Sequence, residues 1–128
     1  MKVFTARSNA SENMGVLVKG ATDAPFVLVD FAELLPSGIT ISSAANVGLD
    51  RDSQTVTSTI VNATGTVSGS TVRVALLTGG SGGTGSATSG DRFRVRTTAT
   101  LSSGGPLVFD TFILVHAPAY APAADPTP

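Results

Sequence analysis

Residues 29–44, VDFAELLPSGITISSA, indicate how this chain folds. An apolar segment ends in Asp-Phe, the link Leu-Leu-Pro-Ser-Gly follows, and Ile39 and Ile41 then alternate with hydroxyl side chains. Pro36 presets φ at the first corner of a turn, and Gly38 can adopt the positive φ that a turn requires. We therefore expect two strands, which flank a chain reversal at residues 34–38.

Short apolar segments recur along the rest of the chain and are separated by Gly, Asp, Asn or Ser. Six or seven short strands with turn signals at this spacing are typical of a β-sandwich. No window keeps the apolar stripe of a helix, and residues 31–35 offer at most one turn. We expect an all-β fold, with strands at residues 26–31, 38–43, 54–61, 71–77, 91–101 and 107–116.

The length of 128 residues corresponds to one domain. Residues 21–117 are expected to form the sandwich, and the β-prone segments 2–6 and 14–19 place a hairpin or an arm in residues 1–20. Residues 118–128 are rich in Pro and Ala and predict an extended tail. The Gly/Ser run at 79–90 predicts a flexible connector between two strands.

Alternation within the expected strands assigns side chains to the core. In residues 92–98, Phe93 and Val95 should point inward while the arginines point outward, because the opposite register would bury three guanidinium groups. The last strand carries apolar residues on both faces, so it is central in its sheet or covered by a partner. The expected core contains Val27, Val29, Ile39, Ile41, Val56, Val72, Val74, Leu76, Phe93 and Val95.

Composition excludes several classes of function. The chain has no cysteine, which excludes disulfides and thiolate chemistry, and its net charge of −1 indicates neither nucleic acid nor an anionic membrane as partner. No apolar run reaches the length of a secretory signal or a membrane span. We expect synthesis in a cytoplasm without secretion by a signal peptide.

No arrangement of residues predicts catalysis, a cofactor or a metal. Residues 80–85 match GxGxxG, but a strand follows where a dinucleotide site needs a helix. His116 is the single histidine, and no Gly-x-Ser-x-Gly nucleophile motif accompanies it. Asp50 and Asp52 lack the further oxygen ligands that a calcium loop requires. We therefore expect a protein that is not an enzyme.

One polar feature suggests binding. Arg92, Arg94 and Arg96 form a row on one strand face, and planar guanidinium groups suit carboxylates on a partner protein. No aromatic residues interleave on this side, which disfavours nucleic acid. A solvated face is the default reading of such a row, and partner binding is the hypothesis set against it. Together with residues of the arm and the tail, the candidate partner-binding set is Arg92, Arg94, Arg96, Val3, Phe4, Val16, Val18 and Tyr120.

Two blocks of the sequence resemble small immunoglobulin-like structural proteins of tailed bacteriophages. The first is the Asp-aromatic pair, Leu-containing turn and Ile-x-Ser-Ser strand of residues 29–44. The second, residues 72–115, joins a strand, a Leu-Thr-Gly-Gly-x-x-Gly turn, a strand ending before Ser-Ser-Gly, and a last strand. The chain departs from that pattern in a longer insert at residues 81–90 and in an extra segment at each end.

This resemblance implies an immunoglobulin-like antiparallel β-sandwich of about seven strands, without catalytic residues. It implies a virion protein that docks a fibre or another appendage to the tail or neck, or alternatively a decoration protein on the outer head surface. The implied partners are the tail, neck, fibre or major capsid proteins, with the chain itself present as a homo-oligomer or as symmetric copies.

A carbohydrate-binding sandwich is a more distant alternative. Such a site needs exposed aromatic rings, and this chain has no tryptophan and one tyrosine, Tyr120, in the expected tail.

Overall fold

The computed structural model describes residues 2–7, 13–20, 23–50, 53–78 and 92–116. These residues form an all-β fold with two short helical segments. Within the same ranges no helix is both long enough and apolar enough to cross a membrane. The elements are β1 (Lys2–Thr5), β2 (Met14–Gly20), β3 (Phe26–Asp30), the 3-10 helix η1 (Ala32–Leu34), β4 (Ile41–Asp50), α1 (Thr57–Ile60), β5 (Thr64–Ser68), β6 (Thr71–Ala75), β7 (Arg92–Leu101) and β8 (Leu107–His116).

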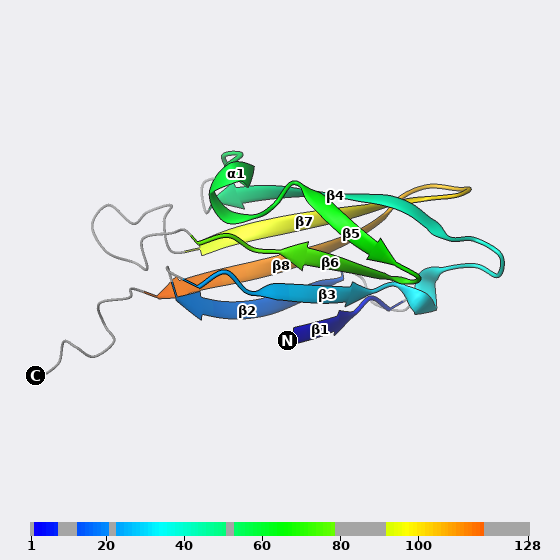
Figure 1. Ribbon diagram of the computed structural model, residues 1–128, viewed down its shortest axis with the longest axis horizontal. Helices are drawn as coiled ribbons and strands as arrows, with labels where there is room; N and C mark the ends of the chain where they lie inside the picture. The colour runs from blue at the N-terminus through cyan, green and yellow to red at the C-terminus, as the bar shows by residue number, and fades with distance from the viewer. Residues whose placement is uncertain (1, 8–12, 21–22, 51–52, 79–91, 117–128) are drawn as a thin grey trace, which may run out of the picture.

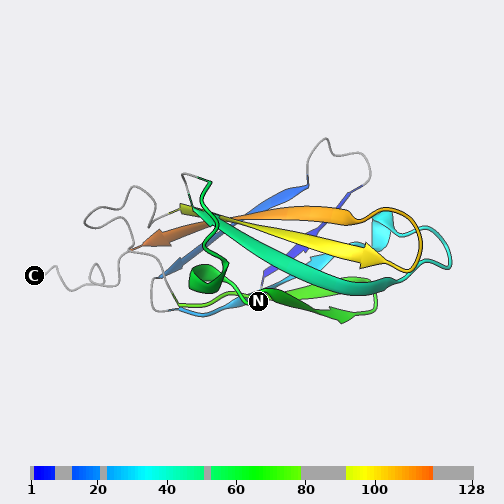
Figure 2. The same ribbon diagram turned by 90° about the horizontal axis from the view of Figure 1, so that it is seen from above.

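The eight described strands form one mixed sheet that curls into a nearly barrel-shaped body, in the order β1-β3-β6-β5-β4-β7-β8-β2. β3, β6 and β5 lie in one layer, and β4, β7, β8 and β2 lie in the other (Figures 1 and 2). β5 joins the layers because Thr64 and Gly65 pair with β4, whereas the remainder of β5 pairs with β6. The core fills the space between the layers.

The expected antiparallel pairing holds among β3 to β8, but the sheet as a whole is mixed. β1 pairs with β3 and β2 pairs with β8, and both pairs are parallel. Neighbours in a parallel pair cannot be joined by a tight hairpin, so their pairing is not visible as a local pattern in the sequence. The segment expected as a hairpin or arm therefore contributes one strand to each end of the strand order.

Most of the expected core is buried. Val27, Val29, Ile41, Val72, Val74, Leu76, Phe93 and Val95 are each less than a tenth exposed. Ile39 and Val56 are only partly buried. The largest fully buried side chains include Phe31, Ile60 and Ile113, which the sequence did not single out.

Residues 54–61 do not form the expected strand. Residues Thr57–Ile60 form the helical turn α1, and the residues at 55 and 61 make isolated β-bridges on either side of it. The turn directs Ile60, which is fully buried, against Gly48 of β4, where a Cβ would lie 2.6 Å from the Ile60 Cγ2. β-branched residues favour strands locally, but the burial of Ile60 favours the turn.

The expected strand at residues 38–43 is shifted. β4 begins at Ile41 and continues to Asp50, and Pro36 and Gly38 belong to the turn that precedes it. β5 was not expected at all. The small and polar residues Ala44, Ala45 and Asn46 resemble a loop in sequence, yet they pair with β5 and β7.

The Phe4 ring connects β1 to β2 across the body. It stacks on Phe109 with ring centroids 5.5 Å apart and lies directly over Gly15 of β2. Gly15 has no positive φ, so glycine is needed here for the close approach of the ring rather than for the backbone conformation.

Replacing Gly15 with alanine should lower the free energy of unfolding by about 1 to 2 kcal/mol, because the new methyl group displaces the Phe4 ring from its stack. Gly105→Ala is the matched control, since a Cβ at Gly105 meets no atom within 4 Å. Urea unfolding of the two variants measures the difference. Equal stability of both would show that the Phe4 contact does not fasten β1.

Candidate docking face

β7 presents the three arginines as the alternation predicts. Phe93 and Val95 are buried, whereas Arg92 and Arg96 are exposed and Arg94 is partly buried. β7 lies between β4 and β8 in the sheet, so both its neighbours bring side chains beside the arginines. The register predicted for this strand is confirmed.

The outward side chains of β2, β8, β7 and β4 form one surface, which we call the outer face. Register places them in rows across the strands: Val18, Leu114 and Arg92 in one, Val16, Phe112, Arg94 and Leu49 in the next, and Met14, Asp110, Arg96 and Val47 in the third. A fourth row contains Val108, Thr98 and Ala45.

Exposed apolar side chains concentrate on this outer face. Among the described residues, the large hydrophobic side chains that are exposed are Val3, Met14, Val16, Val18, Val47, Val108 and Leu114. All of them except Val3 belong to the outer face. Val16 and Val18 are 52% and 60% exposed and border Leu114, which is 41% exposed. A contiguous apolar stripe beside a row of arginines is typical of a surface that binds a partner.

The three arginines differ in their local partners. Arg96 makes a bidentate ion pair with Asp110, in which the Arg96 Nε and one Nη donate to the two carboxylate oxygens at 2.9 and 3.0 Å. The chain itself therefore supplies the carboxylate that pairs with Arg96. Arg92 and Arg94 have no carboxylate partner among the described residues, and the buried Nε of Arg94 has no hydrogen-bond acceptor.

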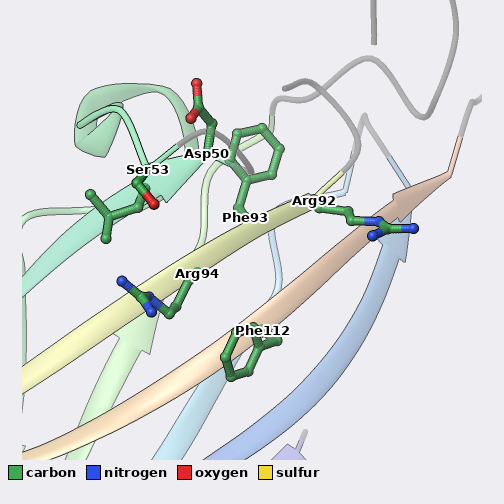
Figure 3. A pocket seen from close by; sticks show the side chains of 7 residues that line it. Asp50, Ser53, Arg92, Phe93, Arg94 and Phe112 are labelled. Carbon is green, nitrogen blue, oxygen red and sulfur yellow. The ribbon is translucent and has the colours of Figure 1, made fainter. Parts of the chain in front are cut away.

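A shallow pocket of about 310 Å³ opens at this unpaired part of the row. Its walls come from β4, β7 and β8 and from the turn after β4 (Figure 3). Arg94 and Phe93 leave β7 in opposite directions, and Asp50 points away from the Arg94 guanidinium (Figure 3). Asp50 instead accepts a hydrogen bond from the backbone N–H of Gln54. The lining residues are Leu49, Asp50, Ser53, Arg92, Phe93, Arg94 and Phe112.

The other sequence-predicted site residues lie elsewhere. Val3 pairs in register with Leu28 of β3, in the layer opposite the outer face, and Phe4 packs inward on Phe109. Tyr120 lies outside the described residues. Val16 and Val18 thus join the arginines on one face, whereas Val3 and Phe4 do not. Sequence reasoning missed Phe112 and Leu114 as site residues, although the apolar residues on both faces of the last strand were a usable signal.

β2 lies at one end of the strand order, and Lys19 protects its edge. Lys19 points inward, is 3% exposed, and its Nζ donates to the carbonyl oxygens of Gly20 and Asp23 at 3.1 and 3.2 Å. An inward-pointing charge near the end of an edge strand discourages the addition of another strand. Strand addition along this edge of β2 is therefore disfavoured.

Burial lowers the pKa of Lys19, and the nearby Asp23 carboxylate opposes that shift only in part. In the pH interval between the lowered pKa and the ordinary one near 10.5, the unfolded chain binds more protons at this position. The free energy of unfolding should therefore rise with pH through this interval. Urea unfolding in steps up to about pH 10 should show the rise, and Lys19→Met should lack it. An equal rise in the free energy of unfolding of both proteins would contradict the conclusion that burial lowers the pKa of Lys19.

Two further features of the described residues bear on a possible site. Among these residues, no three His, Asp or Glu side chains gather as metal ligands would. A second hollow beside α1, of about 530 Å³, is lined by apolar and hydroxyl side chains such as Val56, Thr57 and Leu77 and by no charged group. Residues 80–85 and Asp52, considered above for a dinucleotide and for calcium, lie outside the described ranges.

The chain matches no protein-family model, and no curated protein matches it significantly in sequence.

Proposed function

We propose that this protein is a non-enzymatic structural component of a tailed-phage particle, an adaptor that docks a fibre or another appendage to the tail or neck. The observation that carries the proposal is the outer face, which gathers six of the seven exposed large apolar side chains of the described residues beside Arg92 and Arg94. Such a surface suits a protein partner, and the proposal assigns no reaction to it.

The strand order supports an immunoglobulin-like sandwich for this module. β3-β6-β5 and β4-β7-β8 follow one another as strands B-E-D and C-F-G do in immunoglobulin domains. β2 extends the second sheet beside β8, and β1 extends the first beside β3. The fold then acts as a rigid platform, and the chain works as one of several symmetric copies in the virion.

The number of copies per particle tests the adaptor role. The particle is purified from the phage that encodes the chain, and quantitative mass spectrometry compares this protein with the major capsid protein. We expect a few copies, as a single tail requires. A copy number similar to that of the capsid protein would identify a head decoration protein instead. Absence of the chain from purified particles would contradict a virion role of either kind.

A further inference from the structure

The rows of the outer face differ in whether their arginine is paired with a carboxylate of this chain. In the row of Arg96, the Asp110 carboxylate occupies the guanidinium fork, so this row needs no outside partner. The two neighbouring rows place Phe112 and Leu114, rather than a carboxylate, opposite Arg94 and Arg92. The chain thus neutralises one arginine of the row and leaves two that no described carboxylate pairs.

The Arg94 side chain has an incomplete set of hydrogen bonds. Its Nε is buried from solvent and no acceptor of the described residues reaches it. A buried donor without an acceptor costs stability, and guanidinium donors are best satisfied by a planar, two-oxygen acceptor. The pocket beside Arg94 leaves room for such a group, and the Phe112 ring forms its apolar wall (Figure 3).

The surroundings favour an acidic protein segment over other anions. The next positions on β2 and β8 are Val16, Val18 and Leu114, which suit apolar side chains of a polypeptide. The chain carries a net charge of −1, so it offers no broad positive field for nucleic acid. Asp50 at the pocket rim limits the positive charge further, so one carboxylate fits the site better than a polyphosphate.

We propose that the Arg94 guanidinium binds a carboxylate side chain from an acidic segment of a partner protein, whose adjacent apolar side chains pack on Val16, Val18, Phe112 and Leu114. Arg92, whose side chain points the other way in Figure 3, adds positive charge beside this segment. This inference deepens the proposed docking function by naming the chemistry of the partner. Arg96 remains paired with Asp110 and supports the face without binding the partner.

Selection of short random peptides by mRNA display against the folded protein tests this inference. The selected peptides should be enriched in Asp or Glu next to apolar residues. Arg92→Gln/Arg94→Gln should weaken their binding at least about tenfold, because it removes charge-assisted hydrogen bonds. Replacing the acidic residue of a selected peptide by its amide should weaken binding to the same extent.

Arg73→Gln is the matched control. The Arg73 guanidinium lies over the Phe26 ring, 3.8 Å from its centroid, in the layer of β3 and β6. This change therefore removes an arginine beside a phenylalanine away from the outer face. Binding by this control should equal that of the wild-type protein. Arg94→Lys keeps the positive charge and the aliphatic part of the side chain but lacks the planar guanidinium group, so it should also weaken peptide binding. If the double variant does not fold, Arg94→Lys tests the role of Arg94 in its place.

Four outcomes would overturn the inference, the first three of which concern the selected peptides. These three are selected peptides without acidic enrichment, equal binding by Arg92→Gln/Arg94→Gln and wild type, and an equal loss in the Arg73→Gln control. Tighter binding of a single-stranded oligonucleotide than of any selected peptide would also overturn it. Because these measurements use the isolated protein, they succeed or fail independently of the copy number in particles.

Discussion

Replacing Phe109 with alanine should lower the free energy of unfolding by about 3–5 kcal/mol, the usual cost of removing a buried aromatic ring from a rigid core. Phe109 is 2% exposed, and its ring stacks on Phe4 of β1. The substitution therefore empties part of the core and also removes the surface on which the N-terminal strand rests. Urea unfolding measures the loss.

Val108→Ala is the control for that change. Val108 precedes Phe109 on the same strand, points to the outer face and is 38% exposed. Its replacement should alter stability by about 0.5 kcal/mol or less. If Phe109→Ala were as mild as Val108→Ala, β8 would have the opposite register, and Phe112 and Leu114 would then face the core.

Replacing Asn46 with leucine should cost about 2–3 kcal/mol, although leucine is apolar and similar in size. Asn46 is 2% exposed; its Oδ1 accepts from the Thr97 hydroxyl at 2.7 Å, and its Nδ2 donates to the Asn62 carbonyl at 3.0 Å. Leucine leaves the buried Thr97 hydroxyl without its acceptor, and an orphaned buried polar group costs about 1–3 kcal/mol.

A double-mutant cycle isolates this effect. Thr97→Val removes the orphaned hydroxyl, so Asn46→Leu/Thr97→Val should be less destabilised than the sum of the two single changes. Additive losses would show that the hydrogen bond between the two side chains contributes nothing to stability. The cycle therefore also tests whether this hydrogen bond explains why a buried position of β4 is occupied by asparagine.

Strands with a strong local pattern could be predicted from the sequence. In β7, arginines alternate with Phe93 and Val95, and a register slip would bury charge, so position and direction both follow from the residues. β3 and β6 could be predicted equally well, because their valines alternate with polar or partly buried positions. These three strands supply seven of the buried apolar core residues, namely Val27, Val29, Val72, Val74, Phe93, Val95 and Ala99.

Elements that depend on contacts between residues far apart in the sequence could not be predicted. β4 continues past Ala44 because Asn46 finds its partners in β7 and in the loop before β5, far along the chain. α1 exists because Ile60 fills the space over Gly48, which no local propensity for Thr-Ser-Thr-Ile indicates. Tertiary contacts overrode the local preference in both places.

The candidate site was predicted in part for the same reason. The arginine row follows from β7 alone, but the apolar half of the outer face depends on the parallel pairing of β2 with β8, which is a long-range contact. The pairing of Arg96 with Asp110 depends on the register of β7 and β8. The sequence therefore identified the charged residues of the face and not which of them are already neutralised.

Single-cysteine labelling in the assembled particle tests most directly whether the outer face is the docking surface. The chain has no cysteine, so Val18→Cys on the outer face and Thr66→Cys in the opposite layer, where Thr66 is exposed, are unambiguous reporters. In the free protein both should react readily with a maleimide. In purified particles Val18→Cys should become protected while Thr66→Cys still reacts. Undiminished reactivity of Val18→Cys in particles that contain the protein would contradict the account.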